Sequence, residues 1–192
     1  MTDRIHDERI LFYIRHQELI DTWAAVRRDL REEARQFYLS LADDLAEAAS
    51  GYGEGVAVWT AEGSYSKVGL YLEAWDGEEA PLVLVCLEWH RQATFTEGER
   101  LVGLRVRYGL DDGKSLRPYL GDSVRDIREA AVFGRSSNYW PAFRTAAAPE
   151  GDYWDDLSDY RSLLLGEITS AWHAFREPAD VAIAVWRAQV NT

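Results

Sequence analysis

Hydrophobic residues recur every three or four positions along the first quarter of the chain, which is typical of an amphipathic helix. The stripe consists of Phe12, Leu19, Ile20, Trp23, Val26, Leu30, Ala34, Phe37, Leu41 and Leu45, with His16 on the same face. Residues 7–49 contain neither glycine nor proline, and the glycine-rich "SGYGEG" follows at 50–55. We therefore predict one helix over 7–49, beginning at Asp7 or Thr2 and ended by these glycines.

This helix is longer than a compact domain needs. Unbroken, it would span about 63 Å at about 1.5 Å per residue, whereas a compact chain of this size has a radius of gyration of about 16 Å. Either the helix bends back near residues 28–33, or it projects and pairs with a partner. Packing within the chain and a self-association seam are thus the two interpretations of its stripe over residues 23–45.

The hydrophobic period then shortens to two, which predicts β-strands. The predicted strands are 56–60, 65–75, 82–89 and 101–109. The connections "AEGS", "DGEEAP" and "TEGE" consist of turn residues, and such short connections favour an antiparallel meander. A further short strand is predicted within "NYWPAFR" at 138–144, at a sheet edge because Pro141 is tolerated there.

The strand patterns also predict which faces are buried. Strand 82–89 is apolar on both faces, so it should be central and covered on both sides. The second and fourth strands have one apolar face each, formed by Val68, Leu70, Leu72, Val102, Leu104 and Val106. Their other face should carry Tyr65, Lys67, Tyr71, Glu73, Trp75, Arg105 and Arg107.

Helical spacing returns after the strands. It predicts helices at 115–131, 153–176 and 178–189, with Pro178 in the first turn of the last one. Asp152 is a suitable N-cap for the second, with Asp155 and Asp156 in its first turn.

The predicted fold class is α+β: a long N-terminal helix or helical hairpin, a four- to five-stranded mostly antiparallel sheet, and C-terminal helices. We expect a single domain over 1–192, made of a helical element at 1–50, a sheet region with one inserted helix at 55–145, and helices at 150–192.

Composition and charge narrow the function classes. The 192 residues are 47% hydrophobic and 12% aromatic, so a sizeable core can form. The net charge of −12 disfavours sequence-independent nucleic-acid binding. It also suggests an acidic nucleic-acid mimic, but the mixed signs of "RRDLREEAR" at 27–35 are more typical of a solvated helix face.

The cellular compartment is predicted from the absence of signal-type and membrane-spanning segments in the sequence and from its single cysteine. "MTDRIHDERI" has no signal-type apolar stretch, and no window approaches the roughly 18 apolar residues of a membrane span. The single cysteine, Cys86, lies in the apolar run "LVLVCLEW", which predicts a buried and inert thiol. We expect a cytoplasmic, bacterial-type protein that binds no membrane.

The sequence lacks the common catalytic motifs. GxxxxGK[ST], GxGxxG, HExxH, EF-hand and GxSxG patterns are all missing, and the four histidines are scattered. We therefore expect no cofactor and lean away from an enzyme.

Three residues of the polar sheet face are the candidates for catalysis. Glu73, Glu88 and His90 lie on neighbouring predicted strands, and two carboxylates with a third polar group could hold Mg²⁺ or Mn²⁺ in a nuclease-like hydrolase. The alternative is cross-strand ion pairing of these acids with Arg105 and Arg107.

Two aromatic clusters are candidates for binding. Tyr71, Trp75, Arg105 and Arg107 could form a platform for an anionic or planar ligand. At the predicted edge strand, Tyr139 and Trp140 could expose an aromatic face to a partner.

Several segments resemble known bacterial sequences. "ERILFYIRHQELIDTWAAVRRDLREEA", "YLEAW", "LVGLRV" and "NYWPAF…DYW" are similar to a group of uncharacterised bacterial proteins and to the non-catalytic C-terminal half of large PD-(D/E)xK-superfamily nucleases. There too, an antiparallel sheet precedes a Trp-Pro segment and a helix opening with Trp. The resemblance covers roughly residues 10–180. It implies an accessory or recognition module in a bacterial defence or mobile-element setting, and it transfers no catalytic residue.

Together these observations favour a non-catalytic binding or interaction protein. Its contacts would be with a protein partner or with itself through the N-terminal helix, or through the polar face of the sheet. The alternatives are the metal-dependent hydrolase and, third, the acidic mimic.

Overall fold

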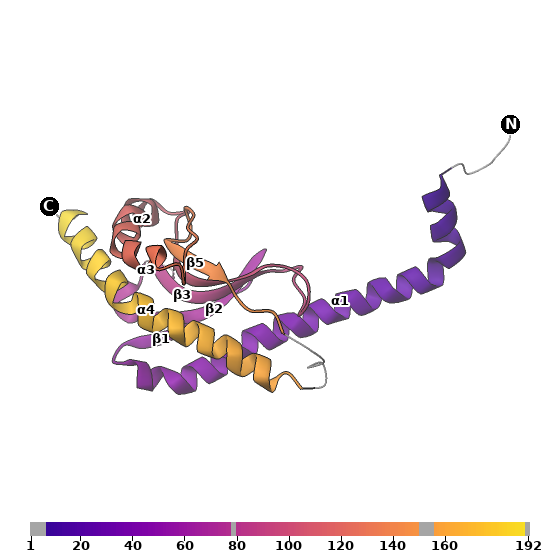
Figure 1. Cartoon of the computed structure of the whole chain (residues 1–192), viewed down its shortest axis with the longest axis horizontal. Coiled ribbons are helices and arrows are strands. Elements are labelled where there is room, and N and C mark those ends of the chain that lie inside the picture. The colour runs from indigo at the N-terminus through magenta and orange to yellow at the C-terminus, as the bar shows by residue number, and fades with distance from the viewer. Residues whose placement is uncertain (1–6, 78–79, 150–155, 191–192) are drawn as a thin grey trace.

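The computed structural model describes residues 7–77, 80–149 and 156–190 (Figure 1). Its elements are helices α1 (Glu8–Ala49), α2 (Asp111–Ser123), α3 (Arg125–Glu129) and α4 (Ser158–Val190), strands β1 (Val56–Ala61), β2 (Tyr65–Leu72), β3 (Val83–His90), β4 (Arg100–Val106) and β5 (Ala142–Thr145), and the 3₁₀ turns η1 (Ser50–Tyr52) and η2 (Glu73–Trp75). The predicted α+β class is confirmed.

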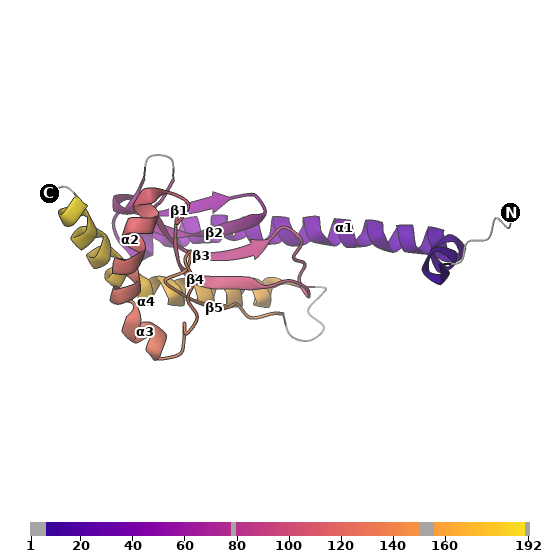
Figure 2. The same ribbon diagram turned by 90° about the horizontal axis from the view of Figure 1, so that it is seen from above.

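Within the described residues, five strands form one antiparallel sheet in the order β1-β2-β3-β4-β5. Strand β3 is central and all of it but its last residue is buried, as its apolar faces predicted. Helices α1 and α4 cover one face, with α1 along β1 and β2 and α4 along β3 and β4 (Figures 1 and 2). The opposite face is called the open face below.

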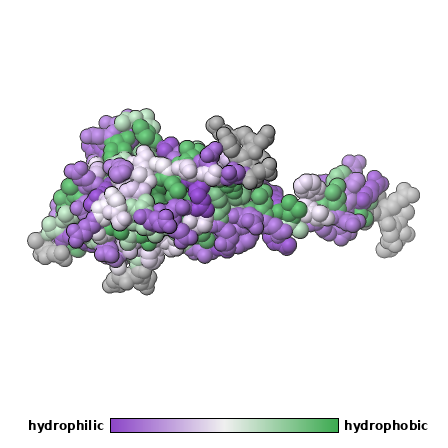
Figure 3. Space-filling model, turned by 90° about the horizontal axis from the view of Figure 1, so that it is seen from below, coloured by the Kyte–Doolittle hydropathy of each residue, from purple (hydrophilic) through white to green (hydrophobic). Residues whose placement is uncertain are grey.

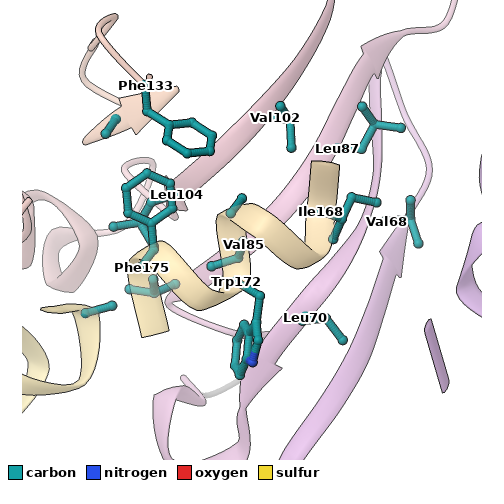
Figure 4. Packing of buried hydrophobic residues seen from close by; sticks show 14 of the residues in the cluster. Val68, Leu70, Val85, Leu87, Val102, Leu104, Phe133, Ile168, Trp172 and Phe175 are labelled. Atoms are coloured by element: carbon teal, nitrogen blue, oxygen red, sulfur yellow. The ribbon is translucent and has the colours of Figure 1, made fainter. Parts of the chain in front are cut away.

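The main core lies between the sheet and α4 (Figure 4). Helix α4 directs Ile168, Trp172 and Phe175 at the strands, where all three are fully buried. The apolar strand face predicted from the alternation meets them: Val68, Leu70, Leu72, Val102, Leu104 and Val106 are each at most 9% exposed. Period-two alternation thus identified the core face of the sheet correctly.

Helix α1 projects beyond the sheet, as Figures 1 and 2 show. The predicted helix is present, and the side chain of Asp7 caps its start by accepting a hydrogen bond from the Arg9 N–H at 2.9 Å. Residues 28–33 are continuous helix, so the bend considered there does not occur. The helix instead has a kink at His16 (φ −122°, ψ 17°).

The prediction for strand 65–75 was wrong at its end. The strand stops at Leu72, and the turn η2 redirects the chain. Trp75 therefore lies in the main core instead of on the polar face. Its ring is 5.6 Å from that of Trp172, and its indole N–H donates to Asp180 at 3.2 Å.

The helix boundaries also differ from the predictions. The stretch at 115–131 is divided into α2 and α3. The two predicted C-terminal helices are one, because α4 continues through Pro178. Figure 2 shows that α4 changes direction toward its C-terminal end. Helix α4 begins at Ser158, whose N–H donates to Asp156 at 2.8 Å. Asp152 and Asp155, predicted to start this helix, lie outside the described residues.

Candidate interaction surface

The straight part of α1 between the kink at His16 and Ala34 lies away from the core. Ala34 is the first buried residue of the helix among those described. Four apolar side chains before it face solvent, and they are called the free stripe below: Leu19 (57% exposed), Trp23 (64%), Val26 (50%) and Leu30 (38%). Figure 3 shows hydrophobic residues on the surface of the projecting helix with hydrophilic ones beside them.

The free stripe continues into two hollows where α1 meets the sheet. One, of about 310 Å³, lies between the stripe and the loop from β3 to β4, and Arg27 bridges it to Glu97 with an ion pair of 2.5 Å. The other, of about 600 Å³, is lined by apolar side chains that include Leu30, Phe37 and Phe95. The apolar surface therefore extends from the projecting helix onto the body of the protein.

Buried contacts hold α1 in its projecting direction. Arg100, itself 4% exposed, donates hydrogen bonds to the carbonyl oxygens of Thr94 (2.9 Å) and Phe95 (3.0 Å) and to the hydroxyl of Tyr38 on α1 (3.3 Å). Phe37 stacks on Tyr160 of α4 with ring centroids 5.7 Å apart. The base of α1 is thus anchored to the loop from β3 to β4 and to α4.

The turns before the kink are also apolar and exposed. Ile10, Phe12, Tyr13 and Ile14 each expose at least 41% of their surface. The Phe12 ring lies 4.5 Å from that of His16, and the Tyr13 hydroxyl donates to Asp21 at 2.9 Å. These two contacts span the kink and hold the first turns at an angle to the rest of α1.

The catalytic candidates do not come together. Glu88 is buried on the open face as the partner of Arg105 (2.6 Å) and Lys67 (3.6 Å). His90 lies at the end of β3 against Tyr65, with rings 5.1 Å apart, whereas Glu73 is exposed on η2 beyond the other end of β2.

Metal ligands do not cluster elsewhere either. Across residues 7–77, 80–149 and 156–190, no three His, Cys, Asp or Glu side chains gather as a metal site would require.

Two of the four residues predicted to form a ligand platform lie together. Arg105 and Arg107 line a hollow of about 240 Å³ on the open face, together with Lys67 and Trp59. Tyr71 lies beside it, its ring 6.5 Å from that of Trp59, and burial raises the pKa of its hydroxyl. Trp75 does not belong to this hollow, since it lies in the main core.

Sequence reasoning did not single out Trp59 and Lys67 as site residues. The strand register reveals them, because Trp59 pairs with Gly69 and Lys67 with Glu88, so both point to the open face. Lys67 and Arg105 are already paired with Glu88, which limits the positive charge that the hollow offers a ligand.

Tyr139 and Trp140 have different environments. Trp140 is 4% exposed and packs on the open face with Leu84, Cys86 and Phe143. The expectation of an exposed Trp140 is therefore wrong: this side chain covers the sheet where β5 begins. Tyr139 is 48% exposed, with the Arg105 guanidinium 5.7 Å from its ring centroid.

Comparison of the chain with known protein families, with curated proteins and with solved structures finds no match. Among the described residues, none of the helices combines the length and apolar content that a bilayer crossing needs.

Proposed function

We propose that this chain is a non-catalytic interaction protein that binds its partner through the free stripe of α1. The observation that carries the proposal is the exposure of Leu19, Trp23, Val26 and Leu30 along one line of a helix held away from the core. Large contiguous apolar surfaces on a protein commonly mark interaction sites. A tryptophan at the centre of the patch suits such a site, because buried aromatics contribute disproportionately to binding.

The rest of the molecule supports a binding role more than a catalytic one. Glu88, the best placed of the candidate acids, is neutralised by two basic side chains, and Glu73 lies on η2, beyond the end of β2. The resemblance of "NYWPAF…DYW" and the α1 sequence to non-catalytic halves of nucleases supports an accessory or recognition role in a bacterial defence or mobile-element setting.

Site-specific photo-crosslinking of the full chain in producing cells tests this proposal. A benzophenone amino acid at Trp23 should form protein adducts on irradiation, because the stripe is covered by a partner. The same probe at Arg28, which points away from the stripe, is the matched control and should form few adducts. Equal yields at both positions, or no adduct at Trp23, would overturn the proposal.

A further inference from the structure

We infer that the outer edge of β1 is a second binding surface, at which an extended peptide segment of another protein adds to the sheet as a further strand. This surface is separate from the free stripe of α1. Strand β1 pairs with β2 along one side, and in the order β1-β2-β3-β4-β5 it is an outer strand. Figure 2 shows it at the margin of the sheet. The backbone groups on its other side determine what can bind there.

The hydrogen bonds between β1 and β2 determine which groups of β1 point outward. The Glu73 N–H donates to the Gly55 carbonyl oxygen at 2.8 Å, and these two residues continue the register of β1 with β2. Hydrogen-bonded pairs alternate along an antiparallel ladder, so the odd-numbered residues of β1 bond to β2. The N–H and C=O groups of Val56, Val58 and Thr60 therefore point away from the sheet. Within the described part of the chain, no hydrogen bond joins these groups to another residue.

The opposite edge of the sheet is closed by the chain itself. The Arg135 N–H donates to the Phe143 carbonyl oxygen on β5 at 3.1 Å, and the Phe143 N–H donates to the Arg135 carbonyl oxygen at 2.9 Å. Natural edge strands avoid unwanted pairing through charged side chains, proline, bulges or short length. Strand β1, "VAVWTA", is uncharged, contains no proline, and pairs with β2 without a bulge over all six residues. It therefore has the features of an edge that accepts a strand.

The outward groups of β1 specify the chemistry of the occupant. Donors and acceptors that alternate at the spacing of a strand are matched by an extended peptide backbone, as in other cases of strand addition. Both faces beside this edge are apolar. On the face covered by α1, the half-buried side chains are Val56 and Val58 of β1 and Leu39 and Ala42 of α1, and on the open face Trp59 is half-buried. The added strand should therefore be uncharged and rich in β-branched and aromatic residues.

Hydrogen exchange of the purified full chain, resolved by residue with NMR, tests whether the edge is open. The amides of Val58 and Thr60 should exchange at least about tenfold faster than those of Ala57 and Trp59, which bond to β2. Protection of Val58 and Thr60 at every protein concentration would show that the chain itself covers the edge. Protection that increases with concentration would show that a second copy covers it. Either result overturns the inference.

A phage-displayed library of random peptides of about ten residues, panned against the immobilised full chain, tests binding. The chain should enrich peptides rich in β-branched and aromatic residues, and the selected peptides should protect the Thr60 amide from exchange. Thr60→Pro removes one outward N–H at a position where an edge strand tolerates proline, so it should weaken binding about tenfold. Thr60→Val keeps the N–H and is the matched control, which should bind as wild type does.

Methylating alternate backbone nitrogens of a selected peptide gives a test that does not depend on how Thr60→Pro folds. It should abolish binding in the register that removes the peptide's donors to β1 and leave binding intact in the other. Failure to enrich any peptide overturns the inference. Selected peptides that leave the Thr60 amide exchanging and are lost on Trp23→Glu would belong to the free stripe, so the proposed function would survive while the edge site would not.

Discussion

Arg105 Nε lies 2.6 Å from Glu88 Oε2 on the open face of the sheet, and the two side chains are only 20% and 7% exposed. Lys67 completes the cluster from the neighbouring strand, 3.6 Å from the same oxygen. The acid that the sequence offered as a metal ligand is therefore the centre of a buried ion-pair cluster joining β2, β3 and β4. Removing the Glu88 carboxylate should therefore lower the stability of the fold.

We predict that Glu88→Ala lowers the free energy of unfolding by about 3 kcal/mol, because it leaves two largely buried cations without their counter-charge. Urea unfolding followed by tryptophan fluorescence measures this. The control is Glu97→Ala, which removes an ion pair with Arg27 whose side chains are both more than half exposed, and should cost no more than about 1 kcal/mol. A fully stable Glu88→Ala, coupled with Mn²⁺ binding by wild type that this variant loses, would favour the hydrolase instead.

We predict a contrast between the two adjacent aromatic residues. Trp140→Ala should destabilise the fold by about 3–5 kcal/mol, because it opens a cavity among Leu84, Cys86 and Phe143. Tyr139→Ala should change stability by no more than about 1 kcal/mol, because nearly half of this side chain is already in water. Thermal unfolding of both variants measures the loss of stability in each. A stable Trp140→Ala that loses partner binding would return this residue to the list of binding candidates.

The thiol of Cys86 should be inert in the native protein. Burial, assisted by the nearby Glu88 carboxylate, raises its pKa, so the reactive thiolate is not populated at neutral pH. Iodoacetamide at pH 8 should leave Cys86 unmodified for as long as the chain is folded and should modify it in denaturing urea. The exposed thiol of Leu19→Cys provides the positive control in the same tube. Rapid native labelling of Cys86 would contradict this prediction.

Glu167 should make the fold less stable as the pH rises. Burial raises its pKa above the ordinary 4.5, although Arg144 at 3.2 Å and the Ala147 N–H act in the opposite direction. The folded chain thus holds this proton more tightly than the unfolded chain. The stabilisation is complete below pH 4.5 and is lost as the pH increases through the raised pKa.

The difference in unfolding free energy between wild type and Glu167→Gln isolates this effect, because the other carboxylates contribute equally to the pH dependence of both proteins. The free energy of unfolding of Glu167→Gln should increase relative to that of wild type as the pH rises from about 4.5. If the free energy of unfolding of Glu167→Gln instead decreased relative to that of wild type with rising pH, the Arg144 ion pair would outweigh desolvation.

Local patterns predicted most of the elements. Three- and four-residue spacing located α1, and alternation located the strands and their core face at Val68, Leu70, Val102 and Leu104. These patterns are reliable because each depends only on the geometry of a single helix or strand. Side chains that face the same apolar surface recur at the period of that element, about 3.6 residues in a helix and two in a strand. They placed Glu88 and Arg105 on the same side of the sheet as well.

The errors occurred where contacts distant in sequence decide the structure. Trp75 leaves the polar face because η2 inserts it against Trp172, and Pro178 remains inside α4 because packing of the helix on both sides of it outweighs the lost hydrogen bond. Trp140 is buried by residues of β3 that no local pattern connects to it.

The sequence by itself thus determined the α+β class, the long helix and the identity of the apolar stripe. Only the tertiary structure decided that α1 projects straight past residues 28–33, so that Leu19, Trp23, Val26 and Leu30 remain exposed while Tyr38, Leu41 and Leu45 are buried. The physical reason is that one continuous stripe has the same period along its whole length, whereas its burial depends on how far the sheet and α4 extend beside it.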